Sequence, residues 1–481
     1  MPCTTILVGK KASYDGSTMI ARNDDNPSGT FQEKDFLVVT KDMQPKLYKT
    51  KISHIEIPLN EEPLSYTAFP NVTKENGIWA ASGINSLNVG MTATETITSN
   101  PRVLGADPYT KDLYNKITSG IGEEDLVVLV LPYIKSAREG VIRLGMLLEK
   151  YGTYEPNGIA FNDKDEIWYL ETIGGHHFIA TKIDDDKYVS MPNQLGIDNF
   201  DLDDALGEQK KYICSKDLKE FISNNHLDIN NNNKFNPRLV FGSHDDSDHV
   251  YNTPRSWAIM RYFNPRTFKW DGTDATYTPE SDDIPFSLVP ERKITIEDMK
   301  WALSNHFQGT LYDPYSKVES PLKNKYRSIG VNRTSLIALL QIRGYMDDLR
   351  QGVVWFSFSS NVFNQLVPFY SKATKVPSYF RCKKAIDVNT FYWANRLIGA
   401  LADANYDKTI TDIERYQASL MSKCHEIITK YDNIKDINID MLNDACKEIA
   451  SVAKYKTSLL LNKVLYIRSM NMKNSYQRSD N

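Results

Sequence analysis

Short runs of apolar and β-branched residues recur along the chain up to about residue 370 and predict strands. The turn dipeptide Asp15-Gly16 separates the first run, Thr4–Val8, from a second at residues 17–21, which together predict a hairpin. Further strands are expected at residues 36–40, 52–57, 64–67, 78–81, 89–92, 158–162, 166–170, 177–181, 188–191 and 353–358.

Helical periodicity interrupts these strands at residues 125–151, where apolar side chains form a stripe. Residues 203–248 are polar and are expected to form a surface excursion with one short helix. After about residue 387 strands disappear, and amphipathic helices are expected at 416–431 and 441–469. Runs of antiparallel strands with grouped helices predict an α+β layered fold rather than alternating βαβ units. We expect one domain over residues 3–386 and a helical C-terminal region, 387–481, packed on it.

Composition narrows the class of protein further. The 481 residues are 41% hydrophobic and 25% charged with a net charge of −4, which disfavours nucleic acid and anionic membranes as partners. The longest apolar runs, 126–131 and 336–340, fall far below the roughly 18 residues of a membrane span, and no signal peptide is recognisable. The five cysteines have no CxxC spacing, which argues against disulfides and zinc. We expect a cytoplasmic protein.

Cys3 is the sharpest candidate for chemistry, although a cysteine near a terminus is ordinarily an incidental small hydrophobe. Removal of a Met1-Pro2 leader, residues 1–2, would leave a thiol and a free α-amino group on one residue. An α-amine has a pKa of about 7.7–8.0, so it can accept the thiol proton and later protonate a leaving amine. Such a nucleophile carries its own base and needs no histidine partner.

A charged segment at residues 21–26 follows the second predicted strand. If the two strands of the hairpin pair, Arg22 returns beside Cys3, where a guanidinium favours the thiolate. A carboxylate in the same segment can orient the α-amine. The alternative is a solvated charge cluster at a strand end, which the neighbouring Cys-Thr-Thr strand makes the less favoured interpretation.

At this point the chain resembles the dipeptidase A family of N-terminal nucleophile (Ntn) cysteine hydrolases, which includes the secernins and is distantly related to bile salt hydrolases and penicillin V acylases. The resemblance covers nearly the whole chain in order. It rests on the segments at residues 3–9, 15–18, 21–25, 82–95, 166–172, 175–177, 251–257 and 261–265.

The resemblance implies a four-layer αββα Ntn-hydrolase sandwich with a helical C-terminal extension. It implies a cysteine-type dipeptidase of broad specificity that forms an acyl-enzyme and uses no metal or cofactor. Arg22 and Asp25 look like the arginine and aspartate that flank the nucleophile in the acylases. Asn193 matches their asparagine near the terminal amine and oxyanion, and Arg255 their second arginine, although Arg261 lies close by in the sequence.

One oxyanion asparagine of the acylases has no counterpart, since its position falls near Thr94 or Glu95. A dipeptidase must recognise a substrate ammonium, and Glu95 is a candidate for that role; an ordinary strand-end glutamate is the alternative. Glu171 has a similar but weaker claim. The His176-His177 pair is expected to have a structural or substrate-lining role, with His177 as the substrate-binding candidate, because adjacent strand residues point to opposite faces and do not readily share one metal ion.

The acidic segment at residues 244–249 matches neither an EF-hand nor a zincin motif and is interpreted as a solvated loop. The other four cysteines are expected to be packing residues. Two alternatives stay open: an amide hydrolase of the bile salt hydrolase or penicillin acylase type, and a secernin-like, non-catalytic interaction protein. Small peptides are the expected partners. A homo-oligomer is compatible with the sequence, which specifies no stoichiometry.

Overall fold

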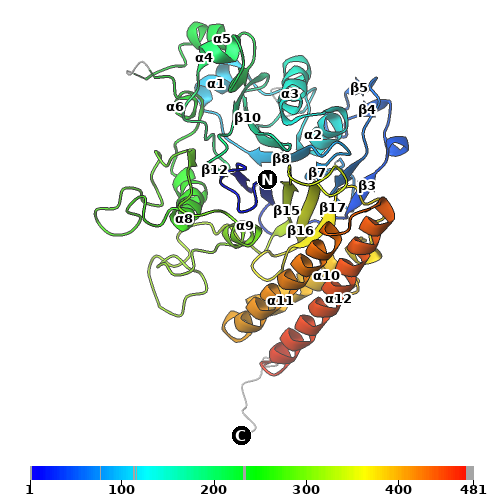
Figure 1. Cartoon of the computed structure of the whole chain (residues 1–481). Coiled ribbons are helices and arrows are strands. Elements are labelled where there is room, and N and C mark those ends of the chain that lie inside the picture. Colours follow the sequence, from blue (N-terminus) through cyan, green and yellow to red (C-terminus); the bar gives the residue numbers. More distant parts are fainter. Residues whose placement is uncertain (1–2, 76, 112–113, 115, 231–233, 473–481) are drawn as a thin grey trace.

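The computed structural model describes residues 3–75, 77–111, 114, 116–230 and 234–472, and it does not describe the side chains of Thr94 and Glu95. The expected leader at residues 1–2 therefore lies outside the described residues. The described chain forms two large antiparallel sheets with helices on their outer sides (Figure 1).

The first sheet has seven strands and contains the N-terminal hairpin at its centre. Its strands, in spatial order, are β14 (Ser287–Leu288), β12 (Tyr188–Met191), β1 (Thr4–Val8), β2 (Thr18–Asp25), β15 (Thr334–Ile342), β16 (Gly352–Phe358) and β17 (Val367–Tyr370). The predicted hairpin is confirmed, because β1 and β2 pair antiparallel with Thr5 opposite Arg22 and Thr4 opposite Asn23.

The second sheet has six strands. In spatial order these are β13 (Tyr212–Cys214), β11 (His177–Lys182), β10 (Ile167–Ile173), β9 (Asn157–Asn162), β8 (Gly90–Thr96) and β7 (Ser82–Ile84). Two small ribbons accompany the sheets: β3 (Leu37–Val39) with β6 (Tyr66–Ala68), and β4 (Leu47–Lys49) with β5 (Glu56–Pro58).

Helices complete the four layers. Strands β2 and β15 contact β8 and β9, so the two sheets stack face to face. Helices α2 (Glu123–Val130) and α3 (Ala137–Tyr151) cover the outer side of the six-stranded sheet. On the other side, α8 (Thr253–Phe263) and α9 (Ile296–Leu303) contact β12, β1 and β2, and α10 (Phe391–Asp403), α11 (Tyr406–Asp432) and α12 (Ile439–Ser469) contact β16 and β17. The predicted α+β fold with an αββα sandwich and helical C-terminal extension is confirmed.

Short helices lie at the edges of the sandwich, and several of them fall in the segment at 203–248, for which one short helix was predicted. They are α1 (Pro101–Ala106), α4 (Leu202–Leu206), α5 (Leu218–Asn224), α6 (Pro237–Phe241) and α7 (Asp248–Tyr251), with single 3₁₀ turns at Lys41–Met43, Leu131–Tyr133 and Ser378–Phe380. The segment at 203–248 therefore contains several short helices, and its β13 extends the six-stranded sheet, so a surface excursion with one helix was wrong.

One other local prediction gains detail and one was wrong, for identifiable reasons. The helical periodicity at 125–151 is divided between α2 and α3, because Pro132, which has no N–H to donate, lies between them, and α3 begins where the Ser136 side chain accepts from the backbone N–H of Glu139. The strand expected at 78–81 is interrupted because Trp79 and Ala81 have positive φ angles of 53° and 56°, which an extended strand cannot contain. Strand β7 begins only at Ser82.

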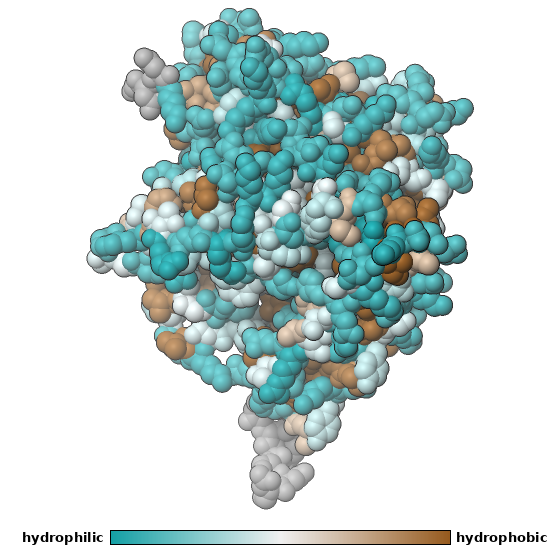
Figure 2. Space-filling model, viewed as in Figure 1, coloured by the Kyte–Doolittle hydropathy of each residue, from teal (hydrophilic) through white to brown (hydrophobic). Residues whose placement is uncertain are grey.

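The surface is mostly hydrophilic on the face seen in Figure 2, with scattered apolar side chains. Among the described residues, no helix combines the length and the apolar character that a membrane crossing requires.

Candidate active site

Cys3 lies directly before β1, in the middle of the seven-stranded sheet, and its side chain is buried. The register of the hairpin carries Arg22 back beside it, and Arg22 Nη2 lies 2.8 Å from Cys3 Sγ. Arg22 is itself 1% exposed, so its charge acts on the sulfur through little screening water. A guanidinium at this distance favours the thiolate over the thiol.

Asp24 is the carboxylate that β2 presents on the same side as Arg22, since residues two apart on a strand share a face. Its Oδ2 lies 2.7 Å from Lys34 Nζ and its Oδ1 lies 3.7 Å from Arg22 Nη2. Burial alone would raise the pKa of Asp24, but the charges of Lys34 and Arg22 outweigh it and lower the pKa. Asp24 is therefore an ionised carboxylate in the site.

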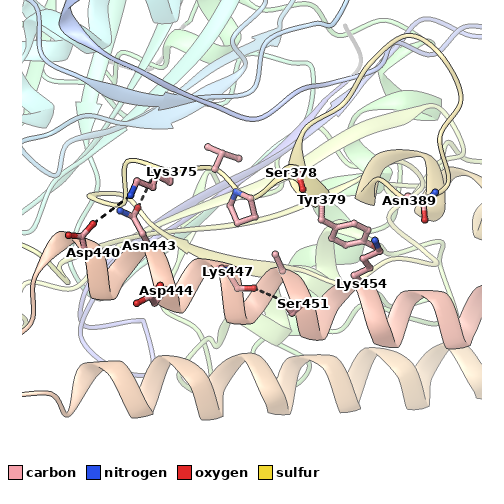
Figure 3. A pocket seen from close by; sticks show the side chains of 13 residues that line it. Lys375, Ser378, Tyr379, Asn389, Asp440, Asn443, Asp444, Lys447, Ser451 and Lys454 are labelled. Atoms are coloured by element: carbon pink, nitrogen blue, oxygen red, sulfur yellow. Dashed lines mark hydrogen bonds and ion pairs between the residues drawn. The ribbon is translucent and has the colours of Figure 1, made fainter.

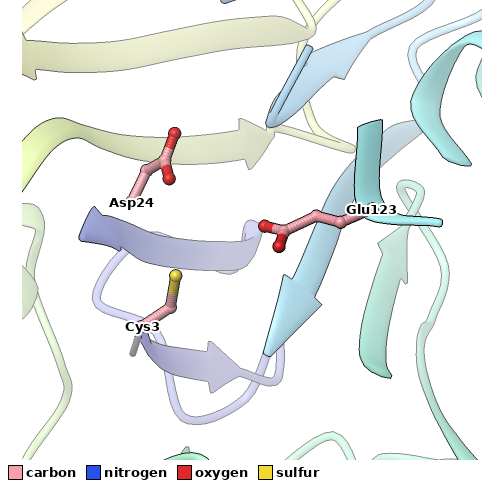
Figure 4. Close-up of side chains that lie close together, drawn as sticks. All are labelled: Cys3, Asp24 and Glu123. Carbon is pink, nitrogen blue, oxygen red and sulfur yellow. The ribbon is translucent and has the colours of Figure 1, made fainter. Parts of the chain in front are cut away.

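Glu123 reaches the site from the first residue of α2, on the other sheet's side of the nucleophile (Figure 4). Its Oε1 lies 3.5 Å from Arg22 Nη2. Cys3 Sγ, a carboxylate oxygen of Asp24 and one of Glu123 all lie within 4.8 Å of one another. Three groups that can carry negative charge thus surround one point in the buried site.

Arg255 holds the backbone of the nucleophile from α8. It is fully buried, and its Nη1 donates to the carbonyl oxygen of Cys3 and, at 2.7 Å, to Thr4 Oγ1. Its Nη2 donates to Asn193 Oδ1 at 2.6 Å and to Asn252 Oδ1 at 2.8 Å. One side chain therefore ties the start of β1 to the loop after β12, which carries Asn193.

Three of the predicted catalytic residues, Arg22, Asn193 and Arg255, are thus linked to Cys3 directly or through one contact.

Asp25 faces away from Arg22: its carboxylate accepts from Thr334 Oγ1 at 2.5 Å and pairs with Arg327 Nη2 at 2.5 Å. Strand alternation explains the difference between Asp24 and Asp25.

Arg261, the sequence neighbour weighed against Arg255, pairs with Asp271 and is one-third exposed. It makes no contact with the Cys3 cluster among the interactions described for it. The two arginines lie six positions apart on α8, which turns their side chains to different sides of the helix.

The predicted substrate-binding residues have separate surroundings. Glu171 is fully buried, and its carboxylate accepts from the backbone N–H groups of Gly196 at 2.6 Å and Ile197 at 3.4 Å. Burial raises the pKa of Glu171 to about 8. Glu95 lies in β8 opposite Gly158, next to a register shift, but its side chain is outside the described residues.

His177 and His176 share one carboxylate. Their Nδ1 atoms lie 2.7 Å and 2.9 Å from the two oxygens of Asp107, and His177 stacks on Phe221. Burial alone would lower the pKa of His177, but Asp107 raises it. The expectation that these histidines point to opposite faces was wrong, because His176 lies in the turn before β11, which begins at His177.

The sequence analysis did not identify Lys34 and Glu123 as residues of this site. It named Asp25 rather than Asp24 as the carboxylate beside the nucleophile. For Asp24 a signal existed, since it alternates with Arg22 along the predicted strand. Nothing in the sequence indicates that Lys34 or Glu123, which come from other elements, meet Cys3.

The groove drawn in Figure 3 is a separate feature. It has a volume of about 640 Å³ and lies between α12 and the segment at residues 375–379. Its lining includes Lys375, Tyr379, Asp440 and Lys447, and none of the residues around Cys3. The chemistry described above therefore lies elsewhere, at the centre of the sandwich.

The family model of Peptidase family C69 matches residues 2–419. A dipeptidase of Bifidobacterium longum is 47% identical over 532 residues, covering 100% of both chains, and dipeptidase A of Lactobacillus helveticus is 44% identical over 474 residues, 97% of this chain and 96% of that protein. Among solved structures, a variant of conjugated bile acid hydrolase from Clostridium perfringens aligns over 77% of this chain and 92% of that chain. The sequence identity is 12% and the TM-score is 0.30, and a similarity this low supports no statement about the site. The family match and the full-length relatives show that the chain belongs to peptidase family C69.

Proposed function

We propose that this protein is a cysteine dipeptidase whose nucleophile is Cys3, exposed as the N-terminal residue when residues 1–2 are removed. The observation that carries the proposal is the 2.8 Å contact between Arg22 Nη2 and a buried sulfur at the head of a central strand. Membership of a peptidase family and full-length relatives called dipeptidases support it.

In the proposed reaction the α-amine of Cys3 accepts the thiol proton, and the Cys3 thiolate beside Arg22 attacks the carbonyl carbon of the peptide. The tetrahedral oxyanion collapses to a thioester as the C–N bond breaks, and the Cys3 α-ammonium gives its proton to the departing amine. Water then attacks the thioester, with the same α-amine as base, and releases the N-terminal amino acid as a free carboxylic acid together with the thiol.

Asn193 is the proposed donor to the oxyanion. Because Arg255 Nη2 donates to its Oδ1, the amide is oriented with its NH₂ group turned away from Arg255. A preorganised donor of this kind lowers the barrier by about 2.7–4 kcal/mol in comparable sites. Asp25, Glu171 and His177 stay predictions as site residues, with the contacts given above.

Processing of the N-terminus tests the proposal directly. The active protein should begin at Cys3, because an amide-bonded nitrogen cannot accept the thiol proton. Intact-mass analysis of active preparations, combined with a dipeptide hydrolysis assay, measures this. A fully active preparation that still begins at Pro2 would contradict the self-base mechanism.

Chelators should leave the activity unchanged within experimental error. Cys3, Asp24 and Glu123 are spaced closely enough for a metal ion, but Arg22 contacts Cys3 and Glu123, Lys34 contacts Asp24, and both cations oppose a divalent cation there. The check is dipeptide hydrolysis before and after dialysis against EDTA. Activity lost in EDTA and restored by zinc would refute the thiol mechanism.

We further propose a reducing, cytoplasmic location, which keeps the catalytic thiol reduced, and small peptides as the only partners that the site requires. The division into a catalytic domain, 3–386, and a helical region, 387–481, also stays a proposal. The homo-oligomer compatible with the sequence stays a prediction.

A further inference from the structure

Asn252 lies at the junction of two helices, and its side chain caps neither of them. It follows the last residue of α7 and precedes the first residue of α8. An asparagine in this position ordinarily accepts a hydrogen bond from one of the first backbone N–H groups of the helix. The Asn252 side chain forms no such bond, although the residue is only 6% exposed and its polar atoms need partners. These atoms therefore serve contacts outside the helix.

The Asn252 oxygen joins two residues of the proposed mechanism. Asn252 Oδ1 accepts from the backbone N–H of Asn193 at 3.2 Å and from Arg255 Nη2 at 2.8 Å. Arg255 Nη2 also donates to Asn193 Oδ1 at 2.6 Å, so the three residues form a closed ring of hydrogen bonds. Two contacts that fix Asn193, one at its backbone and one at its amide, therefore meet at a single oxygen atom.

Asp248 sets the direction in which the Asn252 amide points. Asn252 Nδ2 donates to Asp248 Oδ1 at 2.5 Å, and the two residues lie about one helical turn apart. Asp248 is 2% exposed, and its Oδ2 accepts from Ser243 Oγ at 2.8 Å and from the backbone N–H of Asp245 at 3.3 Å. Because Asp248 acts as an acceptor, Asn252 turns its NH₂ group towards it and its oxygen towards the ring. Asp248 is thus the buried member of an acidic segment that was expected to be a solvated loop.

From this geometry we infer that Asn252, held by Asp248, is the positioning residue for Asn193. The inference rests on the proposed function and deepens it, since Asn193 is the proposed donor to the oxyanion. Asn252 fastens the loop after β12 to the start of α8, which lies beside that strand (Figure 1). A donor lowers the barrier only when it is held where the oxyanion forms, so a displaced Asn193 should slow the chemical step and leave substrate binding unchanged.

Asn252→Ala removes the shared oxygen. We expect kcat for alanyl-alanine to fall by about 30-fold, less than the 10²–10³-fold that removal of such a donor costs, because Asn193 is displaced and not deleted. KM and the rate of iodoacetamide alkylation of Cys3 should each stay within about threefold of wild type, since the contact between Arg22 and Cys3 is retained. In an Asn193→Ala background the same replacement should lower kcat by less than about threefold, because the group that Asn252 positions is already gone.

A sharper test exchanges the two side chains. Asn252→Asp alone sets two carboxyl groups against each other and should lower kcat by about 30-fold or more. When Asp248→Asn is added, the new amide at position 248 donates to the new carboxylate at position 252, which still accepts from Asn193 and Arg255. The exchange keeps the ring and the total charge and reverses the direction of one hydrogen bond. We therefore expect kcat to return to within about threefold of wild type.

Asn264→Ala is the matched control. Asn264 lies at the opposite end of α8, is 1% exposed, and its side chain forms hydrogen bonds with Tyr188, Thr267 and Val289. None of these partners belongs to the ring described above. This replacement should lower the melting temperature by about as much as Asn252→Ala does, because each leaves buried polar groups without a partner, while kcat stays within about threefold of wild type.

The outcomes separate the inference from the function on which it rests. If Asn252→Ala keeps wild-type kcat, or if the exchanged variant melts like wild type but is no more active than Asn252→Asp, the inference is wrong. It is equally wrong if Asn252→Ala slows alkylation of Cys3 as much as hydrolysis, since the role is then to support the fold. If wild type is alkylated at Cys3 but does not hydrolyse alanyl-alanine, the proposed function fails and the inference with it. If Asn252→Ala does not fold, the exchange decides by itself.

Discussion

Replacing Cys3 by serine should lower kcat/KM for dipeptides by about 10⁴-fold or more, because removal of a catalytic nucleophile typically costs this much or more. A hydroxyl beside Arg22 does not ionise at neutral pH, so the guanidinium that favours a thiolate gives serine no comparable advantage. Steady-state hydrolysis of a dipeptide measures the effect. The fold should survive, since serine is close in size to cysteine at this buried position.

The other cysteines offer a matched control. Burial raises the pKa of each of the remaining thiols to about 12, which makes them poor nucleophiles: Cys214, Cys382, Cys424 and Cys446. Cys214→Ser should therefore retain activity, and one equivalent of iodoacetamide should inactivate wild type by modifying Cys3, located by peptide mass mapping. Retention of activity in Cys3→Ser, or loss in Cys214→Ser, would contradict the assignment.

Replacing Arg22 by glutamine should lower kcat/KM by about 10²–10³-fold, the range seen when one preorganised charge-stabilising donor is removed. Alkylation of Cys3 at neutral pH should slow in parallel, because less of the thiol is ionised without the guanidinium. The activity of Arg22→Lys should fall between those of wild type and Arg22→Gln, since lysine keeps the charge but not the planar guanidinium whose Nη2 contacts both Sγ and Glu123.

Arg22→Gln should also destabilise the fold by about 3–5 kcal/mol, because it leaves the buried carboxylates of Asp24 and Glu123 with less compensating charge. Chemical denaturation measures this change. Arg261→Gln is the control, because Arg261 pairs with Asp271 at a partly exposed position and should cost less than about 1 kcal/mol. An Arg22→Gln enzyme with wild-type alkylation kinetics would show that Arg22 does not act on the sulfur.

Local pattern alone identified the central hairpin, because two short apolar runs, Thr4–Val8 and its partner, flank a loop that contains the turn dipeptide Asp15-Gly16. Antiparallel pairing of these two strands was enough to bring Arg22 to Cys3. The strand β15 was missed although its apolar run at 336–340 is visible, since a strand buried on both faces shows no alternation to distinguish it from a helix. The resemblance to a family supplied Asn193 and Arg255, which no local pattern marks.

What the sequence by itself determined is the hairpin, and with it the pairing of a near-terminal thiol with a guanidinium, because both depend on interactions between neighbours in the chain. Only the tertiary structure decided which acids join them. Asp24 replaces Asp25 beside the sulfur through the twist and facing of β2, and Lys34 and Glu123 arrive from a loop and from a helix on the other sheet. These contacts depend on how the two sheets stack, and the packing of distant segments leaves no periodic trace in any one of them.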